Sequence, residues 1–139
     1  MVLGVGVDLA RISDFDRCWP VGPDGAAPAE ADLDAFVRRT FTEAERAEAR
    51  GRGRGGARYL AGRFAVKGAV FKAVAPLTRE GFDLRCVECL ADDAGAPRVV
   101  REGPLAAVLA EAGVDEVLVS ITNEGDLALA MAVAQGPGR

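Results

Sequence analysis

RYLAGRFAVKGAVFKAV, residues 58–74, predicts one long helix in the middle of the chain. Its large apolar side chains, Leu60, Phe64 and Phe71 among them, recur near helical spacing and can share one buried side. Pro76 follows where such a helix should end, because proline cannot continue the helical hydrogen-bonding pattern. We therefore expect a largely buried helix against which the other elements pack.

Three cations, Arg63, Lys67 and Lys72, interrupt the apolar pattern of this helix. Arg63 and Lys67 are four residues apart and share a face, whereas Lys72 is rotated from Lys67 by about 140° at 100° per residue. Taken alone, the cations indicate either a solvated edge of the helix, paired with carboxylates from elsewhere, or a surface that receives an anion.

The composition excludes several classes of function. With 139 residues, 50% of them hydrophobic, the chain is long enough to bury a core, and we expect a single domain over residues 1–139. A formal net charge of −4 argues against general nucleic-acid binding. The sequence contains no histidine, so any chemistry must use carboxylates, lysines, arginines, hydroxyls or the backbone.

The cysteines and the apolar pattern indicate the compartment. Three cysteines are too few for a disulfide framework. Cys86 and Cys89 should point to opposite faces of a strand expected over residues 82–91, so we interpret them as small apolar side chains rather than zinc ligands. The N-terminus lacks a signal-like pattern, and no apolar run approaches a membrane span. We expect a soluble cytoplasmic protein with no membrane partner.

Local signals predict the other elements. Thr42 and Glu45 have the spacing of a helix-capping box, and Pro104 and Gly113 occupy the positions of a helix start and stop. Asn123-Glu-Gly-Asp126 predicts the turn of a hairpin. We expect strands at 2–9, 82–91, 97–101, 114–122 and 126–134, helices at 11–17, 32–39, from 42, 58–74 and 103–113, and a loop at 20–31.

Asp8 is the unusual residue of the first strand. The strand is otherwise apolar, and Gly4 and Gly6 indicate that another backbone or a ligand comes close to it. A carboxylate at the end of a buried strand costs free energy unless it is paired or binds a metal. Asp8 is therefore either a helix cap or ion-pair partner of Arg11, or a ligand for a hard divalent cation.

Three segments, in this order, resemble the holo-acyl-carrier-protein synthase type of phosphopantetheinyl transferase. They are GVGVDL at 4–9, LAGRFAVKGAVFK at 60–72 and VSITNE at 119–124. The resemblance implies an α+β fold with a small antiparallel sheet around the long helix, assembled as a homotrimer with active sites between subunits. It also implies an enzyme that moves phosphopantetheine from coenzyme A to a serine of an acyl carrier protein.

The resemblance also assigns roles by position. It makes Asp8 a ligand for Mg²⁺ and a member of the catalytic group together with Lys67 and Lys72. Positive side chains near the phosphates of coenzyme A would neutralise charge that develops on the leaving phosphate. The implied coenzyme A contacts are Arg63, Lys67, Lys72, Ser120, Thr122 and Asn123.

Three positions depart from the pattern of the family. Gly68 stands where the family carries the glutamate that is its second protein ligand for Mg²⁺, and Asn123 stands where a histidine is usual. Arg11 stands where many relatives have an acidic residue. Residues 18–31 also look longer than the corresponding region, which lies by the carrier-protein docking surface in the family. The departures put the magnesium site in doubt more than they do the fold.

Two functions remain compatible with these departures. In the first, the protein is a transferase whose metal is held by Asp8, water and the pyrophosphate, with Glu43, Glu45 or Glu124 reaching in. In the second, a repurposed member of fatty-acid or polyketide biosynthesis has lost the transferase activity. It would bind, or act by acid-base chemistry on, an acyl or polyketide chain attached to a carrier protein.

Overall fold

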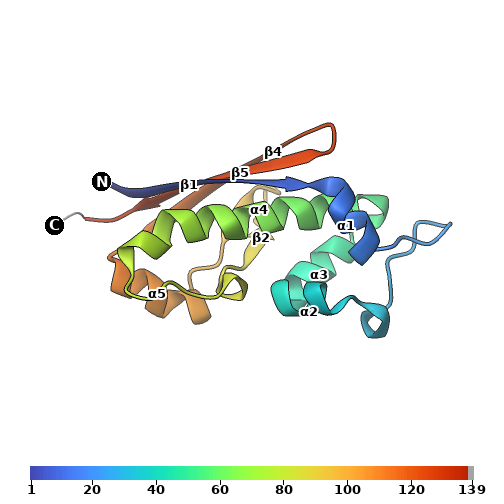
Figure 1. Ribbon diagram of the computed structural model, residues 1–139, viewed down its shortest axis with the longest axis horizontal. Helices are drawn as coiled ribbons and strands as arrows, with labels where there is room; N and C mark the ends of the chain where they lie inside the picture. The colour runs from blue at the N-terminus through green and yellow to red at the C-terminus, as the bar shows by residue number, and fades with distance from the viewer. Residues whose placement is uncertain (138–139) are drawn as a thin grey trace.

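Helix α4, Gly56–Val74, lies along one face of a three-stranded antiparallel sheet in the computed structural model, which describes residues 1–137 (Figure 1). The sheet has the strand order β1-β5-β4, so β1, Val2–Arg11, and β4, Glu116–Glu124, form its two edges. The remaining elements are α1 Ile12–Cys18, α2 Ala35–Thr40, α3 Glu43–Arg50, β2 Cys89–Ala91, β3 Pro97–Val99, α5 Pro104–Ala112 and β5 Leu127–Gln135. Helices α1 to α3 lie near one end of α4, and α5 lies near the other. The antiparallel sheet and the separate helices together form the expected α+β fold.

Small residues allow the sheet to approach α4 closely. A Cβ atom built on Gly4 or Gly6 would lie 1.9 Å from the carbonyl oxygen of Ala73 or Ala69, so only glycine fits at these positions of β1. On β5 the inward-facing residues are the fully buried alanines 128, 130, 132 and 134. The expectation that another backbone lies against Gly4 and Gly6 is confirmed, and that backbone is α4.

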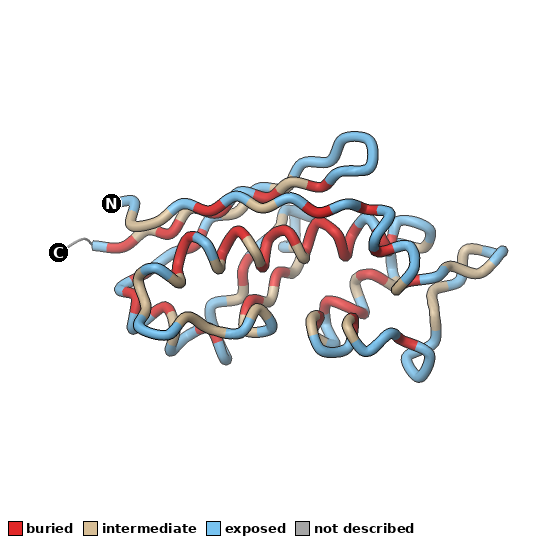
Figure 2. Tube along the Cα trace, viewed as in Figure 1, coloured by how far each residue is buried: buried red, intermediate tan, exposed pale blue. Residues whose placement is uncertain are grey.

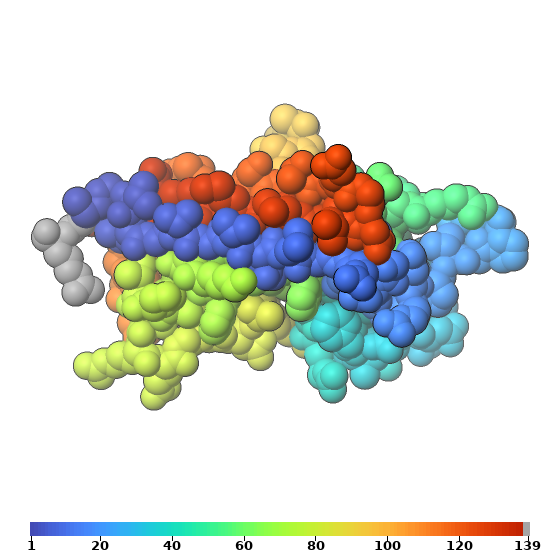
Figure 3. Space-filling model, turned by 45° about the horizontal axis from the view of Figure 1, so that its top comes forward, coloured from blue at the N-terminus to red at the C-terminus, as the bar shows by residue number. Residues whose placement is uncertain are grey.

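The outer face of the sheet is open to solvent (Figures 2 and 3) and carries several large apolar side chains. Figure 3 shows β1 side by side with the β4–β5 hairpin on this face. Side chains alternate along each strand, so the residues that do not face α4 point outward. The large exposed apolar residues of the three strands are Val2, Val5, Val7, Leu9, Leu118, Leu127 and Met131.

The strand expected over residues 82–91 is wrong for most of its length. Only Cys89–Ala91 pairs as a strand, and Leu84–Cys86 forms a short 3-10 helix. The carboxylate of Asp83 accepts a hydrogen bond from the backbone N–H of Arg85 at 2.8 Å, which caps that turn and bends the chain. Cys86 therefore lies outside the strand that contains Cys89.

Most of the local signals are confirmed. The Thr42–Glu45 capping box starts α3 with both of its reciprocal hydrogen bonds. The hairpin forms with strand bounds shifted by one or two residues from those expected. No helix within residues 1–137 is long and apolar enough to span a lipid bilayer.

Substitution Gly6→Ala tests the contact between β1 and α4. Because its Cβ would meet the backbone oxygen of Ala69, we expect the free energy of unfolding to fall by roughly 3 kcal/mol or more in urea denaturation. Gly51→Ala is the matched control, since the nearest atom to its Cβ lies at 3.4 Å and its φ is −66°. It should change stability by about 0.5 kcal/mol at most. Equal midpoints for both variants would contradict the close packing.

Candidate active site

Asp8 and Lys72 form an ion pair between β1 and α4. The Nζ of Lys72 donates to Oδ1 of Asp8 at 3.1 Å and to the carbonyl oxygen of Val7 at 3.1 Å. Gly68 leaves the space that the carboxylate occupies, because a Cβ at this position would lie 2.0 Å from Oδ2 of Asp8. The partner of Asp8 is thus Lys72 rather than Arg11.

The donor set around Asp8 does not fit a protein-held divalent cation. Magnesium is usually held by one or two carboxylates together with waters and substrate phosphates, whereas the single carboxylate here already faces an ammonium group. Across residues 1–137, no three histidine, cysteine, aspartate or glutamate side chains gather closely enough to hold a metal ion.

Lys67 lies inside the protein. Its side chain is fully buried, and its Nζ donates to the two carboxylate oxygens of Glu45 at 2.7 and 3.0 Å and also to the carbonyl of Val87. The Thr42 capping box orients Glu45 inward, and the backbone N–H of Cys89 donates to Glu45 as well. This placement corrects the sequence-based assignment of Lys67 to the phosphate-binding side of the helix, because a ligand has no route to the buried ammonium.

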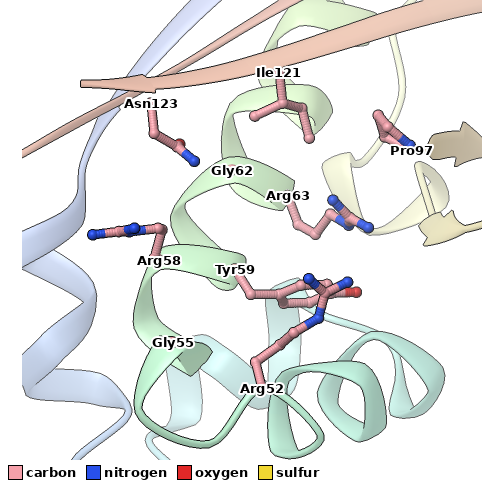
Figure 4. A pocket seen from close by; sticks show the side chains of 9 residues that line it. All are labelled: Arg52, Gly55, Arg58, Tyr59, Gly62, Arg63, Pro97, Ile121 and Asn123. Atoms are coloured by element: carbon pink, nitrogen blue, oxygen red, sulfur yellow. The ribbon is translucent and has the colours of Figure 1, made fainter. Parts of the chain in front are cut away.

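A cavity of about 330 Å³ lies between the first half of α4, β4 and the start of β3 (Figure 4). Ile121 and Asn123 reach down to it from β4, and Arg58 extends away from Arg63 in this view. The residues that line the cavity are Arg52, Gly55, Arg58, Tyr59, Gly62, Arg63, Pro97, Ile121 and Asn123.

Glu48 of α3 holds the most buried arginine of this cavity in place. The guanidinium of Arg63 lies 4.4 Å from the ring centre of Tyr59, and its Nε donates to the carbonyl of Cys89 at 3.1 Å. Glu48 accepts the Tyr59 hydroxyl at 2.6 Å and lies 3.6 Å from the Arg63 guanidinium. Glu48 is itself fixed by the backbone N–H of Ala91.

The cavity is positively charged and has an aromatic wall. The guanidinium group of Arg52 lies 5.1 Å from the ring centre of Tyr59, the same ring that Arg63 contacts. Burial, reinforced by the hydrogen bond to Glu48, raises the pKa of Tyr59 far above its ordinary value, so the phenol stays neutral. Guanidinium groups bind phosphate oxygens through paired hydrogen bonds. The cavity is therefore suited to a nucleotide phosphate.

The site residues assigned from the sequence lie in different parts of the structure. Arg63 and Asn123 share the cavity. Ser120 and Thr122 lie on the outer face of the sheet, because they alternate with the inward-facing Ile121 and Asn123. Lys72 follows Arg63 by nine residues, which places it about 14 Å further along α4 and half a turn around it. Within one chain, the Asp8–Lys72 pair and the cavity are separate centres.

Three cavity residues, Arg52, Arg58 and Tyr59, were not among the site residues assigned from the sequence. The Arg-Gly run over residues 50–56 carried a signal, since basic residues among glycines suit a phosphate-contacting loop, but the pattern is equally typical of a solvated linker. Arg58 and Tyr59 stood at the start of the long helix, where nothing local distinguishes a cavity wall from a helix surface.

Comparison with known proteins identifies the family. The sequence profile of the 4′-phosphopantetheinyl transferase superfamily matches residues 4–132. The chain belongs to this superfamily. A holo-[acyl-carrier-protein] synthase from Desulforudis audaxviator is 37% identical over 140 residues, which cover 99% of this chain and 95% of that protein.

Solved structures of phosphopantetheinyl transferases share the fold. The acyl carrier protein synthase of Mycobacterium tuberculosis is 34% identical with a TM-score of 0.68, over 99% of this chain and 100% of that chain. A coenzyme A complex of the Chronobacterium ammoniagenes enzyme is 27% identical with a TM-score of 0.72, over 97% of this chain and 98% of that chain. The transferase fold expected from the resemblance is confirmed.

Substitution Lys67→Met tests the structural role of the buried ion pair. It leaves the carboxylate of Glu45 buried without its cation, so we expect the free energy of unfolding to fall by roughly 3–5 kcal/mol in urea denaturation. The double variant Glu45→Gln/Lys67→Met should recover part of this loss, because no buried charge remains. Lys72→Met is the control: that side chain is 57% exposed, and its loss should cost about 1 kcal/mol or less. A stable Lys67→Met protein would contradict the buried position.

Proposed function

We propose that this protein transfers the phosphopantetheine arm of coenzyme A to a serine hydroxyl of an acyl carrier protein, of the kind used in fatty-acid or polyketide synthesis. The observation that carries the proposal is the arginine-lined cavity on α4, in a chain that matches a coenzyme A-bound relative over nearly its whole length. None of the comparisons supports the alternative of a repurposed family member. Coenzyme A and acyl carrier proteins, together with three free cysteines, suit a cytoplasmic setting.

The cavity would hold the part of coenzyme A that leaves. In the transfer, the serine oxygen of the carrier forms a bond to the phosphorus of the phosphopantetheine group, and the bond from that phosphorus to 3′,5′-ADP breaks. The serine proton passes to solvent or to a carboxylate. Arg52, Arg58 and Arg63 are suited to bind the phosphates of 3′,5′-ADP, and the amide of Asn123 supplies a neutral hydrogen-bonding group beside them.

The Asp8–Lys72 pair would serve the reacting phosphate. Negative charge develops on the leaving phosphate as the bond breaks, and a fixed cation stabilises it. The ammonium of Lys72 is partly exposed and is held by Asp8 and the carbonyl of Val7, so it is positioned before a ligand arrives. Asp8 acts in this scheme as the group that orients Lys72.

We further propose that the two centres meet across subunits of a homotrimer. The Asp8–Lys72 pair lies under the β1 edge of the sheet, and the cavity lies under the β4 edge. A ring in which the β1 edge of one chain meets the β4 edge of the next would complete a site at each junction. The seven exposed apolar side chains of the outer sheet face are suited to be buried in that assembly.

A carrier-modification assay tests the transfer. Incubation with coenzyme A and apo acyl carrier protein should add the mass of one phosphopantetheine per carrier. Arg58→Gln should raise the KM for coenzyme A roughly tenfold, since it removes one charge-assisted phosphate contact. Arg79→Gln removes an exposed arginine beyond the end of α4 and should leave KM unchanged. Absence of any mass gain with the native protein would overturn the proposed function.

Light scattering after size-exclusion chromatography tests the assembly. The native protein should have three times the chain mass of 14.5 kDa. Met131→Glu places a charge on the outer sheet face and should yield monomers with much reduced transfer, because buried unpaired charge is strongly unfavourable. Ala107→Glu, on the exposed side of α5, is the control and should remain trimeric. A monomeric native protein with full activity would refute the shared site.

A further inference from the structure

Gly68 permits an arrangement in which a carboxylate lies directly against the backbone of a helix. We infer that the Asp8–Lys72 ion pair seated on Gly68 takes the place of a bound divalent cation in this chain, so that Lys72 is the cation that meets the phosphate and no metal ion is needed. The inference rests on the proposed transfer reaction and assigns the charge that would stabilise it.

The hydrogen bonds of Lys72 support this role. An ammonium group has three N–H donors, and two of them have acceptors at 3.1 Å, Oδ1 of Asp8 and the carbonyl oxygen of Val7. The side chain remains 57% exposed, so the third donor is open to an incoming phosphate oxygen. Lys72 is thus fixed in direction while its charge stays accessible.

The surroundings of Gly68 show why the pair depends on glycine. A Cβ there would lie 2.0 Å from Oδ2, 2.6 Å from Cγ and 3.1 Å from Cβ of Asp8, and these are its three nearest atoms. Any larger residue at this position would therefore turn the carboxylate away from its present place beside Lys72. Glycine within a helix is unfavourable relative to alanine, so a specific contact is needed to explain it.

The charges around the pair disfavour a metal ion. The carboxylate and the ammonium cancel, and the ammonium would repel a dication placed on the open side of Asp8. Glu45, the buried carboxylate of α3, is already committed to Lys67. A second oxygen ligand from α4 is missing at Gly68.

Metal binding to the protein alone is the first test. Mn²⁺ titrations followed by electron paramagnetic resonance should show no saturable site in the native protein. Gly68→Glu adds a carboxylate and displaces Asp8 from Lys72, so it should create a saturable site, with an affinity at least tenfold higher than any in the native chain. Gly68→Ala displaces Asp8 without adding an oxygen ligand and should remain unable to bind Mn²⁺.

The second test is transfer measured in excess EDTA and in excess Mg²⁺. The native protein should keep its rate within about twofold in EDTA, and Lys72→Met should lose at least about a hundredfold under both conditions, a loss of the size expected for one preorganised charge at a developing anion. Gly68→Glu should become dependent on Mg²⁺.

The outcomes separate the inference from the proposed function. If EDTA abolishes transfer by the native protein and Mg²⁺ restores it, the metal-free centre is wrong and the transferase activity stands. If no transfer occurs under either condition, the proposed function fails, and with it the role of Lys72 at the reacting phosphate. The Mn²⁺ titrations then decide whether the ion pair on Gly68 keeps a divalent cation out. A saturable metal site in the native protein, or none in Gly68→Glu, would overturn that part of the inference as well.

Discussion

The close approach of the sheet to α4 is the constraint from which the rest of the molecule follows. Gly4 and Gly6 bring the backbone of β1 against the helix, and buried alanines do the same for β5. Because the strand and the helix lie this close together, the carboxylate of Asp8 on β1 reaches the ammonium group of Lys72 on α4. The packing of β1 on α4 therefore also forms the ion pair. If β1 lay further from the helix, the carboxylate of Asp8 would not reach its cation.

Local signals predicted much of this fold, and long-range contacts decided what they missed. The long helix, the capping box at Thr42 and the hairpin turn depend on neighbours in sequence, and each was predicted. The side chain of Lys67 points into the core because it pairs with Glu45, which lies 22 residues earlier in the chain. The capping box of α3 in turn orients Glu45 inward. The faces of Ser120 and Thr122 depend on the register of β4 against β5, which no spacing within β4 reveals.

The candidate site is divided between the two edges of one sheet. On the β1 side, the chain offers a single fixed ammonium held by a carboxylate and a carbonyl oxygen. On the β4 side, it offers several guanidinium groups around an aromatic ring. Sequence similarity identified the family and several of these residues. It could not show that the carboxylate of Asp8 from β1 occupies the space beside Gly68 of α4.

Helix α3 links the stability of the protein to its cavity. Two carboxylates one turn apart on this helix have different tasks: Glu45 neutralises the buried Lys67, and Glu48 braces Tyr59 and Arg63. The two carboxylates also accept hydrogen bonds from the backbone N–H groups of Cys89 and Ala91, so α3 holds the short strand β2 in place. Fraying of α3 would release the cavity wall while the three-stranded sheet stayed intact, so ligand affinity would decline ahead of global unfolding.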